Sequence, residues 1–224
     1  MGEIAIYRSI FGGYDRVFPA CFQDEADNYL VTDRAIKIDG YRIIIINDPI
    51  PNLRRESRRY KMQPWNYLPK YKYYIYLDGT IEMIVSPKKL IDEYINGFDL
   101  AVLKHPWRNC IYDEAEICKK MGLATEAKID RQVKIMRNAG YPENNGLTEN
   151  GVMIWRNTIQ NQIFGSRWWN FYMEHTQRDQ LSFCFIAWEM AIKYNIIETE
   201  IRKDSDLFKF TDHDRTLNAD RKPS

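Results

Sequence analysis

Several motifs that define a protein's class are missing from this sequence. Its four cysteines are scattered without C-x-x-C spacing, which argues against a zinc site and against a dense disulfide framework. It contains neither a G-x-G-x-x-G pattern nor a Walker phosphate loop, so neither a dinucleotide-binding fold nor a phosphate-loop ATPase is indicated. Internal repeats and low-complexity segments are absent too. These absences favour one ordinary folded domain whose chemistry depends on a few local residues.

The sequence also has no excess of charge and no long apolar run. Lys and Arg total 32 and Asp and Glu total 31, so nothing attracts the chain as a whole to nucleic acid or to an anionic membrane. No apolar run is long enough to cross a bilayer, and the first residues lack the parts of a signal peptide. We therefore expect no nucleic-acid partner and no membrane span, and either a cytoplasmic location or a chain that is a piece of a larger protein.

Apolar runs of strand length alternate with polar connections in the first half. They cover residues 3–9, 28–33, 41–47 and 71–78, each bounded by turn formers. The four isoleucines at 43–46 are apolar on both faces, which predicts a strand covered on two sides, as in a mostly parallel sheet between helices. Between the last two runs we expect a helix from its cap at Asn52 to an interruption at Pro64. The pattern is that of an α/β fold.

Helices and strands continue in the second half. Ser86, Pro87 and Gly97 are the cap, the first residue and the end of an expected helix, and residues 98–104 follow as a strand. Helical spacing runs from 111 to 139, residues 151–157 have strand character, and two aromatic-rich helices reach to about residue 195. We predict a single domain, with a tail or linker over residues 203–224.

Three polar residues end apolar runs of the expected sheet: Ser9, Asp33 and Asp78. Ligands of open α/β sheets bind outside the carboxyl ends of the strands. Asp78, followed by Gly79, suits a divalent cation such as Mn²⁺ or Mg²⁺ that bridges to phosphates, although Asp-Gly is also a common hairpin turn. His213 is a candidate second metal contact, although a lone histidine is more often structural.

A basic helix precedes the strand that ends at Asp78. Five of the eight residues from 54 to 61 are Lys or Arg. Arg58 and Lys61 share one face, which would repel itself unless an anion neutralised it. These two side chains are therefore candidates to face the phosphates of a ligand. The alternative is an ordinary solvated stripe.

Two further segments combine suitable groups. In residues 7–15, Ser9, Gly12 and Tyr14 offer a hydroxyl and backbone amides that could cradle part of a nucleotide, unless the segment is a simple turn. Asp179 and Gln180 precede an apolar helix. They predict a catalytic carboxylate and amide beside a sugar ring, unless Asp179 only favours the helix N-terminus.

Five segments together resemble a known family. They are similar in order and spacing to a glycosyltransferase-like family with IFGGYD near its start, found in plant cell-wall, bacterial and viral proteins. The resemblance implies a GT-A-like, Rossmann-like mixed sheet flanked by helices, a UDP-sugar donor, Mn²⁺ and, for a viral member, a location in the host cytoplasm. The segments are IAIYRSIFGGYD, RRESRRYKMQPWNYLPKYKYYIYLDGTI, DLAVLKHPWRNCIYDEAE, ENGVMIWRNT and RDQLSFCFIAWEM.

The resemblance also assigns roles to residues. Asp78 matches the first acid of a D-x-D motif and would bind the metal, but Thr80 replaces the second acid, so that acid's role is in doubt. Asp33 matches a contact to the base or ribose. About residues 1–100 would form the nucleotide-sugar half and about 101–200 the acceptor half. The remaining matches are Arg58 and Lys61 near the diphosphate, His213 at the metal, and Asp179 and Gln180 at the sugar.

We therefore expect a metal-dependent glycosyltransferase that moves a sugar from UDP to a hydroxyl of a glycan or glycoprotein. Retention of anomeric configuration is favoured because no general base stands out. The acceptor would enter beside residues 149–155 and Trp155, Trp168 and Trp169, although abundant aromatics can simply pack. Two alternatives are metal-dependent nucleotidyl or phosphoryl transfer, which usually needs a second close carboxylate, and non-catalytic binding of glycan or nucleic acid.

Overall fold

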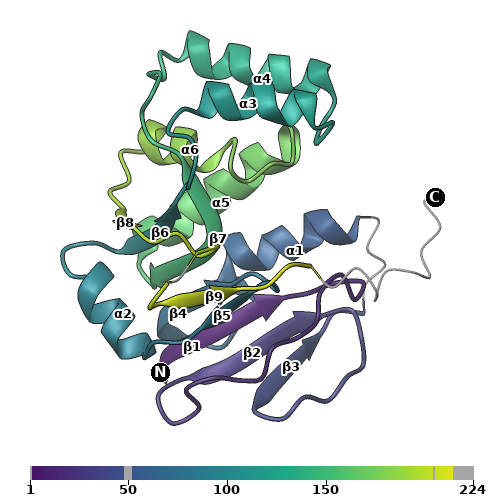
Figure 1. Ribbon diagram of the computed structural model, residues 1–224, viewed down its shortest axis with the longest axis vertical. Coiled ribbons are helices and arrows are strands. Elements are labelled where there is room, and N and C mark those ends of the chain that lie inside the picture. The colour runs from purple at the N-terminus through teal and green to yellow at the C-terminus, as the bar shows by residue number, and fades with distance from the viewer. Residues whose placement is uncertain (1, 48–51, 204, 214–224) are drawn as a thin grey trace.

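The computed structural model describes residues 2–47, 52–203 and 205–213 of the 224-residue chain. Within them, seven strands form one sheet in the order β3-β2-β1-β4-β7-β6-β8, with helices on both faces (Figure 1). Strands β5 and β9 form a separate two-stranded sheet. This mixed α/β architecture confirms the fold class predicted from the sequence. Among the same residues, no helix has both the length and the apolar character needed to cross a bilayer.

The sheet has a parallel part and a mixed part. In the parallel part the carboxyl ends of four strands share one edge, and β7 then runs antiparallel between β4 and β6, so that β7 begins where β4 ends. Asp78 follows β4 directly, and its amide donates to the carbonyl of Gly151 at 2.8 Å. The strands are β1 (Gly2–Ser9), β2 (Asp27–Thr32), β3 (Tyr41–Ile45), β4 (Tyr71–Leu77), β6 (Leu100–Lys104), β7 (Thr148–Arg156) and β8 (Asn195–Ile197).

The strand with the isoleucine run is not covered on both faces, contrary to the sequence prediction, and it lies at the edge of the sheet. β3 pairs with β2 alone in the described sheet, none of its residues is fully buried, and Ile45 is 42% exposed. The strands covered on both faces include β1, where Ala5 and Tyr7 enter one core and Ile4 and Ile6 enter the other. A doubly apolar run does not by itself place a strand in the centre, because β-branched residues also suit an edge.

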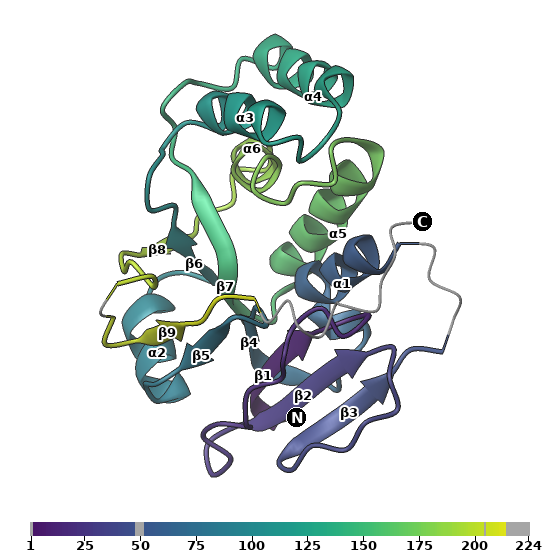
Figure 2. The same ribbon diagram turned by 45° about the vertical axis from the view of Figure 1, so that its right-hand side comes forward.

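Two neighbouring helices cover one face of the sheet. Helix α1 (Leu53–Met62) begins as predicted after Asn52, whose side chain accepts from the amide of Arg55 at 2.9 Å, and a short 3₁₀ turn, η1 (Pro64–Asn66), follows it. Helix α5 (Ile159–Glu174) lies beside α1 (Figure 2). Gly165 permits this close approach, since a Cβ there would lie 2.3 Å from the carbonyl oxygen of Met62.

The helical region from 111 to 139 is two helices, not one. α3 (Ile111–Lys120) and α4 (Glu126–Asn138) are separated by a turn in which Gly122 has φ of +61°. They lie with α6 (Phe183–Glu189) at the end of the molecule away from β2 and β3 (Figure 1). α2 (Pro87–Tyr94) packs against the opposite core, and Ser86 precedes it as predicted, but the Ser86 hydroxyl donates to Glu25 instead of capping the helix.

The described residues after 204 are part of the fold, and we call residues 205–213 the C-terminal strap. Within the strap, β9 (Phe208–Phe210) pairs antiparallel with β5 (Ile81–Met83). Phe208 is wholly buried, and the amide of Thr211 donates to the carbonyl of Thr80 at 2.9 Å. Residues 204 and 214–224 of the predicted tail lie outside the described residues.

Candidate functional site

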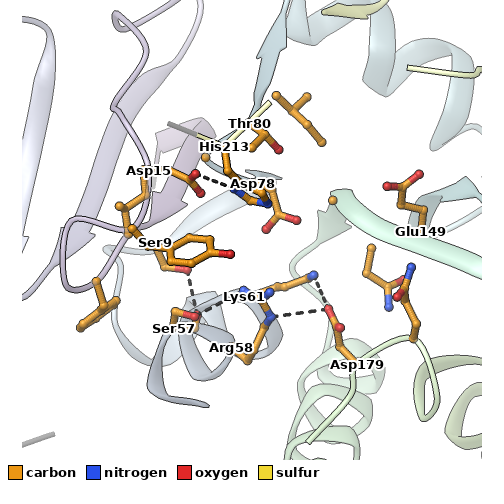
Figure 3. A pocket seen from close by; sticks show the side chains of 18 of the residues that line it. Ser9, Asp15, Ser57, Arg58, Lys61, Asp78, Thr80, Glu149, Asp179 and His213 are labelled. Carbon is orange, nitrogen blue, oxygen red and sulfur yellow. Dashed lines mark hydrogen bonds and ion pairs between the residues drawn. The ribbon is translucent and has the colours of Figure 1, made fainter. Parts of the chain in front are cut away.

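A cavity of about 380 Å³ opens at the carboxyl edge of β1 and β4. Its walls come from the loop after β1, helix α1, the turn after β4, the start of β7, the loop before α6 and the C-terminal strap (Figure 3). This is the edge at which open α/β sheets bind ligands. The structure brings most of the predicted site residues into the lining: Ser9, Tyr14, Arg58, Lys61, Asp78, Gly79, Asp179, Gln180 and His213.

Gly12 and Asp33 lie behind the lining. Asp33 accepts a hydrogen bond from the amide of Gly12 at 2.7 Å, so its carboxylate shapes the loop after β1. The hydroxyl of Ser9 is also used within the protein, because it donates to the carbonyl of Ser57 in α1 at 2.8 Å. These two bonds hold the loop and the basic helix at the cavity wall. Contact of Gly12, Asp33 and Ser9 with a nucleotide stays a prediction.

Asp78 occupies both a turn and the cavity wall. Its carbonyl accepts from the amide of Ile81 at 3.1 Å, which closes a turn, but β4 and β5 do not form a hairpin, because β5 pairs with β9. Its carboxylate accepts a hydrogen bond from the hydroxyl of Tyr76 at 2.7 Å and lines the cavity. The hairpin alternative is therefore wrong, and the carboxylate is placed where a ligand can reach it.

Asp15 is a cavity residue that the sequence reasoning did not select. Its Oδ1 lies 2.6 Å from Nδ1 of His213, and its Oδ2 lies against the turn after Asp78, where a Cβ on Gly79 would come within 2.6 Å. Burial raises the pKa of the Asp15 carboxyl, although contact with His213 opposes that change. The sequence feature that could have identified Asp15 is its position at the end of the loop-forming segment 7–15.

Asp179 is in direct contact with the basic helix α1. Its Oδ2 accepts from Nζ of Lys61 at 2.5 Å and lies 3.7 Å from Nε of Arg58 (Figure 3). Burial alone would raise the pKa of Asp179, but the charges of Lys61 and Arg58 outweigh burial and hold it well below its ordinary value. The N-cap position of α6 is Ser182. Asp179 is thus a buried, ionised partner of α1 and not merely a helix cap.

The wall formed by the start of β7 adds groups that the sequence reasoning did not single out. Asn150 is only 2% exposed, and its Oδ1 accepts from the hydroxyl of Thr148 at 2.9 Å. Its Nδ2 has no hydrogen-bond partner among the described residues, although a buried amide donor normally has one. Beside it, Glu149 forms two short hydrogen bonds with Arg202. The sequence feature that could have identified these residues is the polar start of the strand over residues 148–156, which enters this edge of the sheet.

The tryptophans assigned to the acceptor side belong to the core, so that part of the prediction is wrong. Trp155 and Trp168 are wholly buried, and Trp169 is nearly so. Trp155 and Trp168 pack around Phe164 of α5, and Nε1 of Trp168 donates to the hydroxyl of Ser182 at 2.9 Å. Their bulk fills the space between the sheet and α5, where an acceptor cannot pass. Of the predicted acceptor segment, residues 149–151 do line the cavity.

The residues of the cavity fit a metal ion that is shared with a substrate. Across the described parts of the chain, no three His, Cys, Asp or Glu side chains converge as a complete metal site. Asp78 and His213 both line the cavity, however, and would offer an oxygen and a nitrogen ligand to such an ion. Mg²⁺ is usually held by one or two carboxylates with substrate phosphates completing its shell. Two protein ligands in an open cavity suit that mode of binding, and a closed all-protein cage does not.

A solved glycosyltransferase structure with a similar backbone supports a GT-A-like fold for this chain. The apo structure of the bifunctional glycosyltransferase WbbM has a TM-score of 0.52 at 5% identity and covers 88% of this chain and 39% of that chain. Two weaker similarities have TM-scores of 0.46 at 10% identity. They are mouse xyloside xylosyltransferase 1, covering 89% of this chain and 85% of that one, and galactosyltransferase LgtC with donor and acceptor sugar analogs, covering 88% and 74%.

Sequence comparison identifies the family. A model of the TOD1/MUCI70 glycosyltransferase-like domain matches residues 20–213, so the protein belongs to the TOD1/MUCI70 glycosyltransferase-like family. A curated relative, "Probable hexosyltransferase MUCI70" of Arabidopsis thaliana, is 25% identical over an alignment of 187 residues that covers 77% of this chain and 32% of the relative. The chain thus spans about a third of that relative's length. The IFGGYD segment at 10–15 lies outside the family match.

Proposed function

We propose that this protein is a metal-dependent glycosyltransferase that moves a sugar from UDP to a hydroxyl group of a glycan or glycoprotein. The observation that carries the proposal is the layout of the cavity. Asp78 and His213 lie on one wall, and Arg58 and Lys61 of α1 lie on the opposite wall (Figure 3). A diphosphate placed between them would meet positive charge from both sides, which is what a phosphate-based leaving group needs.

The donor would lie across the carboxyl ends of β1 and β4. Asp78 and His213 would hold Mn²⁺ or Mg²⁺, which supplies charge neutralisation at the departing diphosphate. Arg58 lines the cavity with its Nε 3.7 Å from Oδ2 of Asp179, and it adds a fixed guanidinium charge. We assign the nucleotide to the neighbouring loops, with Ser9, Gly12, Tyr14, Asp33 and Gly79.

The sugar would lie between α1 and the start of β7. Asp179 and Gln180 enter the cavity from the loop before α6, and Asn150 enters from β7. The free Nδ2 of Asn150 is suited to donate to a sugar hydroxyl, which would satisfy a buried donor that has no partner among the described residues. Asp179 would place negative charge near the anomeric carbon while Lys61 keeps it ionised.

The state of the acids supports retention of anomeric configuration. An inverting enzyme needs a carboxylate or imidazole that is free to take the acceptor's proton. Every acid in the described lining of the cavity is already hydrogen-bonded or paired within the protein. Asp15 bonds His213, Asp78 bonds Tyr76, Glu149 pairs with Arg202, and Asp179 pairs with Lys61. The acceptor's proton would then be transferred to the departing diphosphate on the same face of the sugar.

A screen for release of UDP tests the proposal. Purified protein is incubated with a set of UDP-sugars, with and without Mn²⁺, and free UDP is measured. We expect release from at least one donor only with metal, and a loss of about 100-fold or more in Asp78→Ala. Asp92→Ala, which removes an exposed acid on α2, is the matched control and should behave as wild type. No release from any UDP-sugar, or full activity in Asp78→Ala, would refute the proposal.

The acceptor and the setting of the reaction are part of the same proposal. The family name and the relative's name support transfer of a sugar, and the glycan or glycoprotein acceptor stays a prediction from the sequence. A cytoplasmic location and a viral origin stay predictions from the sequence. Nucleotidyl or phosphoryl transfer is less well supported, because the acid next to Asp78, which is Asp15, is already bound to His213.

A further inference from the structure

A contact between the two ends of the chain lies within the cavity. Nδ1 of His213, in the C-terminal strap, is 2.6 Å from Oδ1 of Asp15, in the loop after β1. The Asp15 side chain is only 10% exposed, whereas that of His213 is 44% exposed. The carboxylate is therefore the fixed partner, and the imidazole is the group whose orientation it controls.

We infer that Asp15 is a positioning residue that fixes His213 as a metal ligand. A carboxylate oxygen accepts hydrogen bonds, so we assign the donor role in this 2.6 Å contact to Nδ1 of His213, which leaves Nε2 as the ring nitrogen that can bind a metal. In Figure 3 the imidazole lies between the carboxyl groups of Asp15 and Asp78. Histidines that bind metals commonly donate their other ring N–H to a carboxylate, which sets tautomer and orientation. The inference rests on the proposed function and deepens it.

Asp15 acts through His213 and not as a ligand itself. Its Oδ1 is used by the imidazole, and its Oδ2 lies so close to the turn after Asp78 that a Cβ at Gly79 would meet it at 2.6 Å. Consistent with this, no three metal-binding side chains converge within the described ranges. Both carboxylate oxygens of Asp15 face protein groups, so Asp78 and His213 are left as the two direct ligands.

The strap reaches the cavity by contacts that do not involve Asp15. Phe210 of β9 pairs with Ile81, and the amide of Thr211 bonds the carbonyl of Thr80. Removal of the Asp15 carboxylate therefore leaves the strap docked and frees only the rotation of the His213 ring. We expect a loss of metal affinity with little loss of stability, which separates positioning from a general structural role.

The experiment measures Mn²⁺ binding to the full chain in the presence of UDP, without turnover. Free Mn²⁺ is followed by its EPR signal in wild type, Asp15→Asn, Asp15→Ala, His213→Ala and the double variant. We expect Asp15→Ala to weaken Mn²⁺ binding by about 10- to 100-fold and Asp15→Asn by less, since its amide oxygen still accepts. Asp212→Ala, which removes an exposed acid from the same strap, is the control and should bind as wild type.

Two readouts separate this inference from its rivals. The effects of Asp15→Ala and His213→Ala should not add, because both act through one imidazole, and pulsed EPR of bound Mn²⁺ should show nitrogen coupling that weakens in both variants. Additive losses, unchanged affinity in Asp15→Ala, or unaltered nitrogen coupling would overturn the inference. Unfolding of each variant without metal checks that it is folded. If Asp15→Ala is unfolded, Asp15→Asn takes its place in the comparison. Absence of Mn²⁺ binding by the wild type would instead contradict the proposed function.

Discussion

Lys61 shows how much one residue contributes to the site. Its side chain is 1% exposed, its Nζ bonds Asp179 at 2.5 Å, and it lies 5.2 Å from the ring centre of Tyr76. Burial of an ammonium group is costly, and a single close carboxylate offsets that cost. Removal of one member leaves the other charged and buried. The pair therefore ties α1 to the loop before α6 at the wall of the cavity.

Replacement of Lys61 with Met should destabilise the protein strongly. The variant keeps the aliphatic stem but removes the closest positive charge from Asp179 and leaves the charges of Arg58 and Arg178, so we expect a loss of about 3 kcal/mol in the free energy of unfolding, measured in urea. Lys119→Met is the matched control, because Lys119 is also 2.5 Å from a carboxylate, that of Asp130, but the Asp130 side chain is 62% exposed. Its loss should be far smaller. Equal losses in both variants would contradict the role of burial.

The pH dependence of stability should reveal the charge on Asp179. Its pKa is lower in the folded protein than in the unfolded chain, where it is about 4. The carboxylate thus stabilises the fold fully above about pH 4, and this contribution disappears as the pH falls below that value. We expect wild type to lose more stability than Asp179→Asn between about pH 5 and pH 2. Parallel profiles for the two proteins in urea unfolding would show that Asp179 has an ordinary pKa.

At the scale of elements, the packing of α5 on α1 positions the basic residues. α1 carries Arg58 and Lys61 to the cavity, and its end lies against Gly165 of α5. A Cβ at Gly165 would also come within 2.8 Å of Trp65. A glycine in mid-helix normally lowers helix stability relative to alanine by about 1 kcal/mol. The close contact with Met62 and Trp65 therefore explains Gly165, and helix propensity does not.

Gly165→Ala should therefore destabilise the protein despite the better helix propensity of alanine. We expect a net loss of about 2 kcal/mol, because overpacking against a backbone carbonyl outweighs the gain in propensity. Thermal unfolding measures the change, with Asn170→Ala at an exposed position of α5 as the control. A stabilised Gly165→Ala protein would mean that α1 and α5 can separate without cost.

At the scale of the whole molecule, the cavity is closed by contacts between distant parts of the chain. Lys61 and Asp179 are 118 positions apart, Asp15 and His213 are 198 apart, and Glu149 and Arg202 are 53 apart. Each pair joins two walls of the cavity. A ligand that bridges the same walls binds only the folded state, so it should stabilise the protein by mass action.

UDP together with Mn²⁺ should raise the midpoint of thermal unfolding. At a ligand concentration of about 100 times Kd the gain is about 2.7 kcal/mol, which corresponds to roughly 5–10 °C for a domain of this size. Asp78→Ala should lose the metal-dependent part of the shift. A larger shift with ATP or GTP would favour nucleotidyl or phosphoryl transfer, and a response to oligosaccharide or RNA alone would favour a binding module.

The sequence by itself determined the elements and the chemistry of one edge of the sheet. Polar residues at the ends of apolar runs, such as Asp78, are local signals, and the cap at Asn52 acts within one helical turn. Only the tertiary structure decided that the isoleucine strand is at the edge, that Trp155 and Trp168 are core, and that Asp15 meets His213. These outcomes depend on which strands become neighbours and on contacts across the whole chain, and neither periodicity nor spacing encodes them.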